Sequence, residues 1–361
     1  VTAPPMEKDV DRQIELVREA IAKHPDAIIL AASDYERMVP VCKEVTDAGI
    51  LLVTVDSDVN YDGRRCFVGT DNVAIEAMSS VVNRNSDIKT STVTTTGAVE
   101  IINLLDSREL EGGYTGSINL VQALRGEEPF QKEIPASSML QAFGFVSWRL
   151  PVLTVAGSGI ESYEDLRGKK MAFPDVGSAS TEVLKIVLRE AGVLDDVNIE
   201  YFTWSDGFSA LKDGRVDACV GTWGNGVPPA GIIELLTVRD INILSLPPEV
   251  GAKIHEINPG IMAQDLTHAE CNIIPEGDPR LSPVNAGVMI FHADVPEESV
   301  YEFTRACISN IEELGKITQD LKPLKDYVTS VCVEDVPFHP GAARALKEAG
   351  LWDDRFTVYG E

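Results

Sequence analysis

The chain has 361 residues, of which 44% are hydrophobic, so it can bury a sizeable core and form two or three domains. Its 57 acidic residues outnumber 31 basic ones, which gives a formal net charge of -26. This charge repels nucleic acid and anionic lipid headgroups, and we expect neither as a partner. It does not exclude an anionic small ligand, because a few local amide groups outweigh a distant field that salt screens over about 10 Å.

The first part of the chain alternates helical and strand patterns. Helical periodicity covers 11–23 and 35–47, and short apolar runs cover 26–31 and 50–55. Strand, helix and strand joined by short links are typical of a parallel α/β unit. The polar stretch from Asn83 to Ser91 follows, and it is the best candidate for a domain junction.

Beyond this junction the alternation continues to the C-terminus. Strands are predicted at 91–95, 153–156, 170–173, 199–203, 218–221, 241–246 and 286–291, and helices at 99–105, 180–191, 208–212, 230–236, 297–314 and 342–349. This order indicates an α/β protein with mainly parallel sheets, in which ligands bind at the carboxyl ends of strands.

The apolar segments are too short to span a membrane, which takes roughly 20 residues, so no direct membrane insertion is expected. The chain begins at Val1 without a signal segment, which suggests a mature or truncated product. The six cysteines are widely spaced, a pattern that favours buried free thiols over disulfides or a metal site. The five histidines are scattered, and no common catalytic or nucleotide-binding motif occurs. We therefore expect no enzymatic activity, no cofactor and no metal.

Small and hydroxyl residues follow the strand predicted at 170–173. Residues 173–182 read Phe-Pro-Asp-Val-Gly-Ser-Ala-Ser-Thr-Glu and open an amphipathic helix. A helix start exposes unpaired backbone N–H groups and about half a positive charge, so a ligand carboxylate can dock there. Ser178, Ser180 and Thr181 would be further donors. The alternative is ordinary N-capping by Ser178 or Ser180, with Glu182 taking up the free amides.

Three other segments carry hydroxyl, glycine or aromatic residues that are candidates for ligand contacts, and two residues of the N-terminal part follow strand-like runs. The candidates are Thr95, Thr96 and Gly97 in the first segment, Ser117 in the second, Trp223 in the third, and Asp56 and Thr70 in the N-terminal part. The hydroxyl and glycine residues either contact a ligand or form capped turns. Trp223 either covers a pocket or packs in the core. Asp56 and Thr70 either bind polyol hydroxyls or form turns.

Several ordered segments from about residue 93 to the C-terminus carry a resemblance. They are Thr-Thr-Gly-Ala-Val-Glu-Ile-Ile-Asn-Leu-Leu at 95–105, Ser-Gly-Ile-Glu-Ser-Tyr-Glu-Asp-Leu-Arg-Gly at 158–168, Gly-Ser-Ala-Ser-Thr-Glu at 177–182, Glu-Ala-Gly at 190–192, Leu-Lys-Asp-Gly-Arg-Val-Asp-Ala at 211–218 and Phe-His-Pro-Gly-Ala at 338–342. Together they resemble the TAXI-type solute receptors of TRAP transporters.

The resemblance implies a two-lobed periplasmic-binding fold of type II around a hinge. Such a receptor binds a small organic acid or amino acid without chemistry, outside the cytoplasm, and presents it to a TRAP-type membrane permease. The resemblance favours ligand contacts by Thr95, Ser117, Ser178, Ser180 and Thr181 over capping. The sequence departs from the family at several positions, which are Thr96, Ala98, Ile101, Arg108 and Ala179. The family's ligand preference therefore transfers poorly.

Residues 1–85 instead resemble the ribose-type type I periplasmic sugar-binding proteins. The matching segments are Asp-Val-Asp-Arg-Gln-Ile-Glu at 9–15 and the runs 25–34, 48–57 and 67–72. Asp56 and Thr70 match positions that touch sugar in that family. The resemblance implies a partial type I-like α/β unit at 1–85, ahead of a receptor domain at 86–361 that lacks its family's first strand and loop.

Two partial binding proteins thus stand in one chain. This favours a chimeric sequence over a natural fusion. The N-terminal segment also gives an alternative function, the sugar-binding component of an ABC-type importer or a sugar-sensing regulator.

Overall fold

The computed structural model describes residues 10–25, 27–30, 37–55, 66–68, 72–93, 95, 97–174, 178–318 and 321–361. The chain divides into two compact units, Val1–Glu76 and Ala77–Glu361. The boundary falls inside helix α3 (Asn72–Asn85), earlier in the chain than the division expected at residue 85.

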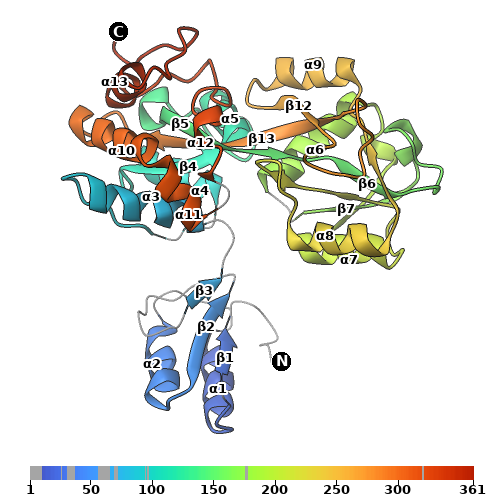
Figure 1. The fold of residues 1–361 in the computed structure, drawn as a ribbon, viewed down its shortest axis with the longest axis horizontal. Helices are drawn as coiled ribbons and strands as arrows, with labels where there is room; N and C mark the ends of the chain where they lie inside the picture. The colour runs from blue at the N-terminus through green and yellow to red at the C-terminus, as the bar shows by residue number, and fades with distance from the viewer. Residues whose placement is uncertain are drawn as a thin grey trace. The chain divides into compact units, whose positions relative to one another are not determined.

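The described part of the first unit is a small parallel α/β unit, as predicted (Figure 1). Its elements are α1 (Val10–Ile21), β1 (Ala27–Leu30), α2 (Val39–Asp47), β2 (Leu51–Val55) and β3 (Cys66–Val68). The strands pair in the order β1-β2-β3, all parallel. Val17 of α1 and Val41 of α2 are buried in one cluster with Ile28 and Leu52 of the sheet. The helical periodicity of the sequence therefore marks the faces that cover this sheet.

The first lobe of the second unit surrounds an antiparallel sheet. Its elements are α3, α4 (Ala98–Asp106), β4 (Gly112–Gly116), α5 (Ser117–Arg125), β5 (Leu140–Arg149), β13 (Arg280–Phe291), α10 (Glu297–Ser309), α11 (Ile311–Ile317), α12 (Leu324–Tyr327) and α13 (Pro340–Glu348). The Phe303 ring of α10 lies 6.4 Å from the Phe143 ring and 5.2 Å from the Phe291 ring, between ring centres. These aromatic contacts hold α10 on the sheet.

The second lobe surrounds a mixed sheet with the order β11-β6-β9-β7-β8 among the described strands. Its elements are β6 (Val152–Val155), β7 (Lys170–Phe173), α6 (Ala179–Glu190), β8 (Asn198–Tyr201), α7 (Trp204–Lys212), β9 (Ala218–Val220), α8 (Ala230–Val238), β11 (Ile241–Leu244) and α9 (Pro248–Ile257). Met171 and Phe173 of β7 pack in one core cluster with α6, whereas Ala172 packs in another with α7 and α8. Alternate residues of a strand point to opposite faces, so the sheet is covered on both sides.

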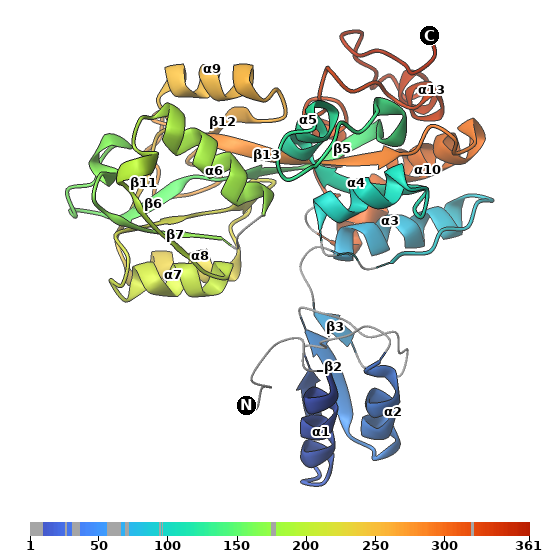
Figure 2. The same cartoon turned by 180° about the vertical axis from the view of Figure 1, so that it is seen from behind.

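Two long strands connect the lobes (Figures 1 and 2). β5 and β13 pair with each other along most of their length, and β13 also pairs with β4 at its C-terminal end. At the other end β10 (Trp223–Gly224) pairs with β5, and β12 (Met262–Leu266) pairs with β13. The second unit is therefore a two-lobed α/β protein whose lobes share a pair of continuous strands.

Three structural predictions were wrong in detail. The described residues of 91–95 form no strand, because Thr90 is bound back to α3 by Asn83, whose Nδ2 donates to the Thr90 carbonyl at 2.9 Å. The helix predicted at 297–314 is broken at Asn310, whose φ of -121° is not helical. The sheets of the second unit are not mainly parallel, because β5 and β13 run between the lobes in opposite directions.

None of the helices that the structure describes is both long and apolar enough to cross a bilayer. The cysteines at 219, 271, 307 and 332 are buried free thiols, and Cys42 is buried in the core of the first unit.

Candidate functional site

The start of α6 carries the main predicted constellation, and Ser178 is its N-cap. The Ser178 Oγ accepts a hydrogen bond from the Thr181 backbone N–H at 3.2 Å and donates to the Thr181 Oγ1 at 3.1 Å. The capping alternative is therefore correct for Ser178. Thr181 is fully buried, and its hydroxyl donates to the carbonyl of Pro174 at 3.0 Å. The Thr181 side chain thus anchors the preceding segment to α6.

The Ser180 hydroxyl, unlike those of Ser178 and Thr181, has no hydrogen-bond partner among the described residues. Ser180 is half-buried, and within the described part of the chain neither its hydroxyl nor the backbone N–H groups of Ala179 and Ser180 make a hydrogen bond. Glu182 does not take up these amides, because its carboxylate pairs with Lys185 Nζ at 3.1 Å. The start of α6 therefore has hydrogen-bond donors without partners and the partial positive charge of a helix N-terminus. The nearby Glu182 carboxylate is neutralised by Lys185. Such an environment favours binding of an anion.

The start of α4 is the second predicted helix end, and unlike α6 it has no side-chain cap. Its N-cap is Gly97, whose φ of 139° and ψ of -171° belong to a region that only glycine adopts readily. Thr95 is half-buried just before it, whereas Thr96 lies outside the described residues. In Figure 2 the N-terminal ends of α4 and α6 point toward one another from the two lobes.

Ser117 was predicted to contact a ligand, and the structure places it in the interior. It is fully buried at the start of α5, where its hydroxyl donates to the carbonyl of Gly260 at 2.5 Å and accepts from the Ala286 N–H at 3.0 Å. Both interactions hold the α9–β12 connection and β13 against α5. The Ser117 hydroxyl already makes these two hydrogen bonds inside the protein. We therefore remove Ser117 from the candidate site.

Trp223 is also a core residue. Its ring is fully buried in the cluster that covers one face of the second-lobe sheet, with Leu153 and Phe208. A ring in this position cannot cover a ligand, so the core alternative is correct. Trp148 was not among the predicted site residues. It is half-buried near the C-terminal end of β5 and lies opposite Asn285 of β13. The sequence signal for Trp148 would have been an aromatic residue near the end of a predicted strand. No strand was predicted over the residues that form β5, so this signal was missed.

Asp56 and Thr70 of the sugar-like segment lie outside the described residues. Two surface hollows, of about 430 and 580 Å³, are lined by residues of α9 and β12 and by residues around α11. No predicted site residue lines either hollow. Among the described residues no three His, Cys, Asp or Glu side chains gather closely enough to hold a metal ion.

Comparison with known families gives a match over most of the chain. A model described as the NMT1-like family matches residues 68–350. The chain belongs to the NMT1-like family. A second model, described as a periplasmic binding protein domain, matches residues 1–78. The two matches meet close to the boundary between the compact units.

Similar proteins are named as binding proteins rather than enzymes. A binding protein of Brucella abortus (strain 2308) is 27% identical over 179 residues, which cover 48% of this chain and 51% of that protein. The chain thus spans about half the length of the curated relatives it matches first. The D-ribose/D-allose-binding protein of Pseudomonas aeruginosa is 35% identical over 72 residues, 18% of this chain and 23% of that protein.

Among solved structures, the periplasmic aliphatic sulphonate binding protein of Escherichia coli aligns with a TM-score of 0.41 at 16% identity. The alignment covers 77% of this chain and 85% of that one.

Proposed function

We propose that this protein is an extracytoplasmic solute-binding receptor. It captures a small carboxylate-bearing ligand, an organic acid or amino acid, and delivers it to a TRAP-type membrane permease. The observation that carries this proposal is the start of α6, where the Ser180 hydroxyl and two backbone N–H groups have no partner among the described residues.

A carboxylate satisfies these donors at once. Hydrogen bonds to a charged acceptor are roughly twice as strong as those between neutral groups, and the helix dipole adds to them. The net charge of -26 makes such a local arrangement necessary, because the protein as a whole repels an anion. Thr95 and Gly97 at the start of α4 would contact the ligand from the other lobe.

The shared strands supply the mechanism of capture. Because β5 and β13 run through both lobes, bending near their middle moves the lobes as rigid bodies. A ligand that bridges α4 and α6 stabilises the closed arrangement, and the permease would recognise that form.

The alternative function is sugar binding by the N-terminal unit. The match of residues 1–78 to the periplasmic binding protein domain and the relation to a ribose-binding protein favour it. The three described strands of this unit form only a small sheet, and a sugar clamp needs a second lobe. We therefore rank it second.

The test is a thermal-shift panel of organic acids, amino acids and sugars on the full chain, followed by calorimetric titration of each compound that shifts the Tm. A ligand that binds only the folded state raises the Tm. Carboxylates should do so and sugars should not. A clear sugar shift without any carboxylate shift would reverse the ranking of the two functions.

Ser180→Ala locates the site. It should weaken carboxylate binding by about 1 to 2 kcal/mol, because a charge-assisted hydrogen bond is lost. The matched control is Ser330→Ala, whose hydroxyl donates to the carbonyl of Asp326 in the first lobe. Equal affinity of Ser180→Ala and wild type would assign Ser180 to the protein surface. Reconstituted uptake that requires ATP would contradict delivery to a TRAP permease.

A further inference from the structure

The start of α5 brings together two side-chain amides, one from α5 and one from β13, that the α6 site does not use. α5 spans nine residues, and its N-cap Gly116 has no side chain to pair with the open amides. A Cβ atom on Gly116 would lie 2.8 Å from Asn119 Oδ1 and 3.0 and 3.1 Å from the Oδ1 and Nδ2 atoms of Asn285. Glycine at this position therefore lets two carboxamides converge on the helix start.

The side-chain oxygen of Asn119 receives no hydrogen bond from the described residues. The residue is 3% exposed, its Nδ2 donates to Gln122 Oε1 at 3.0 Å, and its Oδ1 is buried with no hydrogen-bond partner in the described structure. An unpaired buried acceptor carries a free-energy cost, because it has lost its hydrogen bonds to water and gained none in the protein. Such a cost persists where a function uses the group, so Asn119 Oδ1 points to an N–H or O–H donor from outside the protein.

Asn285 complements it. The residue is 4% exposed on β13, and its Nδ2 donates to no described acceptor. Trp148 lies directly opposite it on β5, so both side chains stand on the same face of the sheet. Trp148 and Ala179, the first residue of α6, are both partly exposed at the edge of one core cluster, which also contains Ile118 of α5. The indole and the α6 start therefore border the same core, with Asn285 opposite the indole on β13 and Asn119 next to Ile118 in α5.

We infer that Asn119 and Asn285 form the specificity-determining part of the ligand site and require a hydrogen-bond donor beside the ligand's carboxylate. Asn119 Oδ1 accepts from an ammonium or hydroxyl group of the ligand, and Asn285 Nδ2 donates to a ligand oxygen. The site thus selects amino or hydroxy acids over 2-oxo acids, whose carbonyl leaves Asn119 unpaired. This inference rests on the proposed function, because it assumes that the carboxylate docks at α6.

The experiment measures affinity within two matched sets by calorimetry on the full chain. The first set is L-glutamate, 2-hydroxyglutarate and 2-oxoglutarate, and the second is L-alanine, L-lactate and pyruvate. In a set that binds, the amino or hydroxy acid should bind at least about tenfold more tightly than the oxo acid, because a buried polar group left unpaired strongly disfavours the analogue.

Asn119→Leu should reduce that preference to within about twofold, because the acceptor is gone. Gln122→Leu is the matched control. It removes the same Asn119–Gln122 hydrogen bond but keeps the Asn119 Oδ1, so it should retain the preference.

Two results overturn the inference and leave the proposed function standing. One is an oxo acid that binds as tightly as its amino and hydroxy counterparts, and the other is an Asn119→Leu variant that keeps the preference. If no member of either set binds the wild type, the inference is overturned, whereas the proposed carboxylate function is decided by the wider thermal-shift panel. If Asn119→Leu does not fold, the wild-type preference within each set still tests the inference.

Discussion

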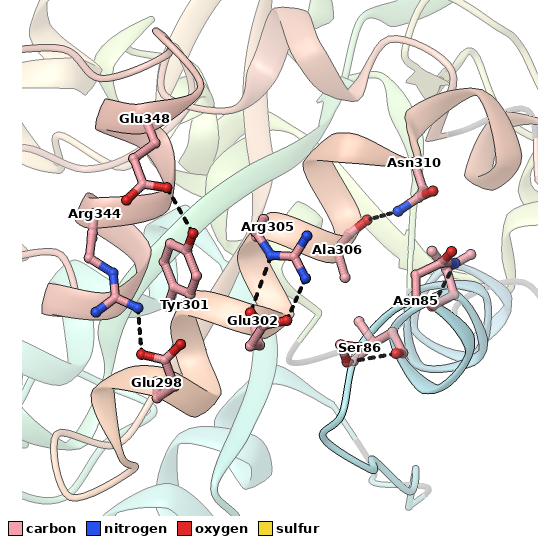
Figure 3. A network of polar contacts seen from close by, with 12 residues as sticks. Asn85, Ser86, Glu298, Tyr301, Glu302, Arg305, Ala306, Asn310, Arg344 and Glu348 are labelled. Atoms are coloured by element: carbon pink, nitrogen blue, oxygen red, sulfur yellow. Dashed lines mark hydrogen bonds and ion pairs between the residues drawn. The ribbon is translucent and has the colours of Figure 1, made fainter.

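Arg344 of α13 stacks on Tyr301 of α10, with its guanidinium carbon 3.7 Å from the ring centre (Figure 3). The Tyr301 hydroxyl donates to Glu348 at 2.7 Å, and Arg344 pairs with Glu298 at 2.6 Å. These contacts join α13 to α10 within the first lobe.

Arg344→Ala should lower the Tm by about 2 °C, because the stacking is lost, whereas exposed ion pairs contribute little. Arg344→Lys keeps the charge but loses the planar stacking group, so it should fall between Ala and wild type. A differential scanning experiment on the three proteins measures this order. A Lys variant as unstable as the Ala variant would mean that charge alone contributes nothing here.

Gln141 of β5 satisfies three backbone groups in the interior. It is fully buried, its Nε2 donates to the carbonyls of Val333 and Val336 at 2.8 and 2.6 Å, and its Oε1 accepts from the Val333 N–H at 2.8 Å. Gln141→Leu should cost about 2 to 4 kcal/mol of unfolding free energy, because it leaves buried polar groups unpaired. Urea denaturation measures the loss. A loss below that of Gln264→Leu, which breaks one bond to Ser147, would contradict this account.

His339 gives the stability a pH dependence of known sign. It caps α13, because its Nδ1 accepts from the Gly341 N–H at 3.3 Å while its Nε2 donates to the Val295 carbonyl at 3.1 Å. Burial lowers the pKa of His339, although the Val295 carbonyl and Glu297 oppose the shift. The contribution is present above the ordinary histidine pKa of about 6.5. It is lost as the pH falls through the lower pKa of the folded state, because only the neutral ring can accept from Gly341.

His339→Asn retains a capping side chain but does not titrate. The difference in unfolding free energy between wild type and His339→Asn should therefore shrink or change sign between pH 7.5 and pH 5. Urea denaturation at both values measures it. A difference that stays constant would show that His339 does not titrate in this range.

Ser178 and Ser180 should separate stability from binding. Ser178→Ala removes the α6 cap and should cost about 1 kcal/mol of unfolding free energy, with Ser178→Asn restoring most of it. Ser180→Ala should leave stability nearly unchanged, because its hydroxyl has no partner among the described residues. Denaturation of the three variants provides the comparison. A Ser180→Ala loss equal to that of Ser178→Ala would make both residues caps.

The sequence by itself determined the local elements whose signal lies within one segment. The strand at 170–173 and the helix that follows Ser178 were predicted within a residue or two, because hydrophobic periodicity and capping residues act over a few neighbouring positions. The open hydroxyl of Ser180 belongs to the same local signal.

Only the tertiary structure decided which side chains remain available to a ligand. Trp223 and Ser117 are residue types that often contact ligands. In the structure, however, the Trp223 ring packs in the core and the Ser117 hydroxyl bonds to Gly260, which is distant in sequence. Trp148, Asn119 and Asn285 come together because β5, α5 and β13, far apart in sequence, share one sheet and its flanking helix. Burial depends on such long-range partners, and the hydrophobic pattern of a single segment does not specify them.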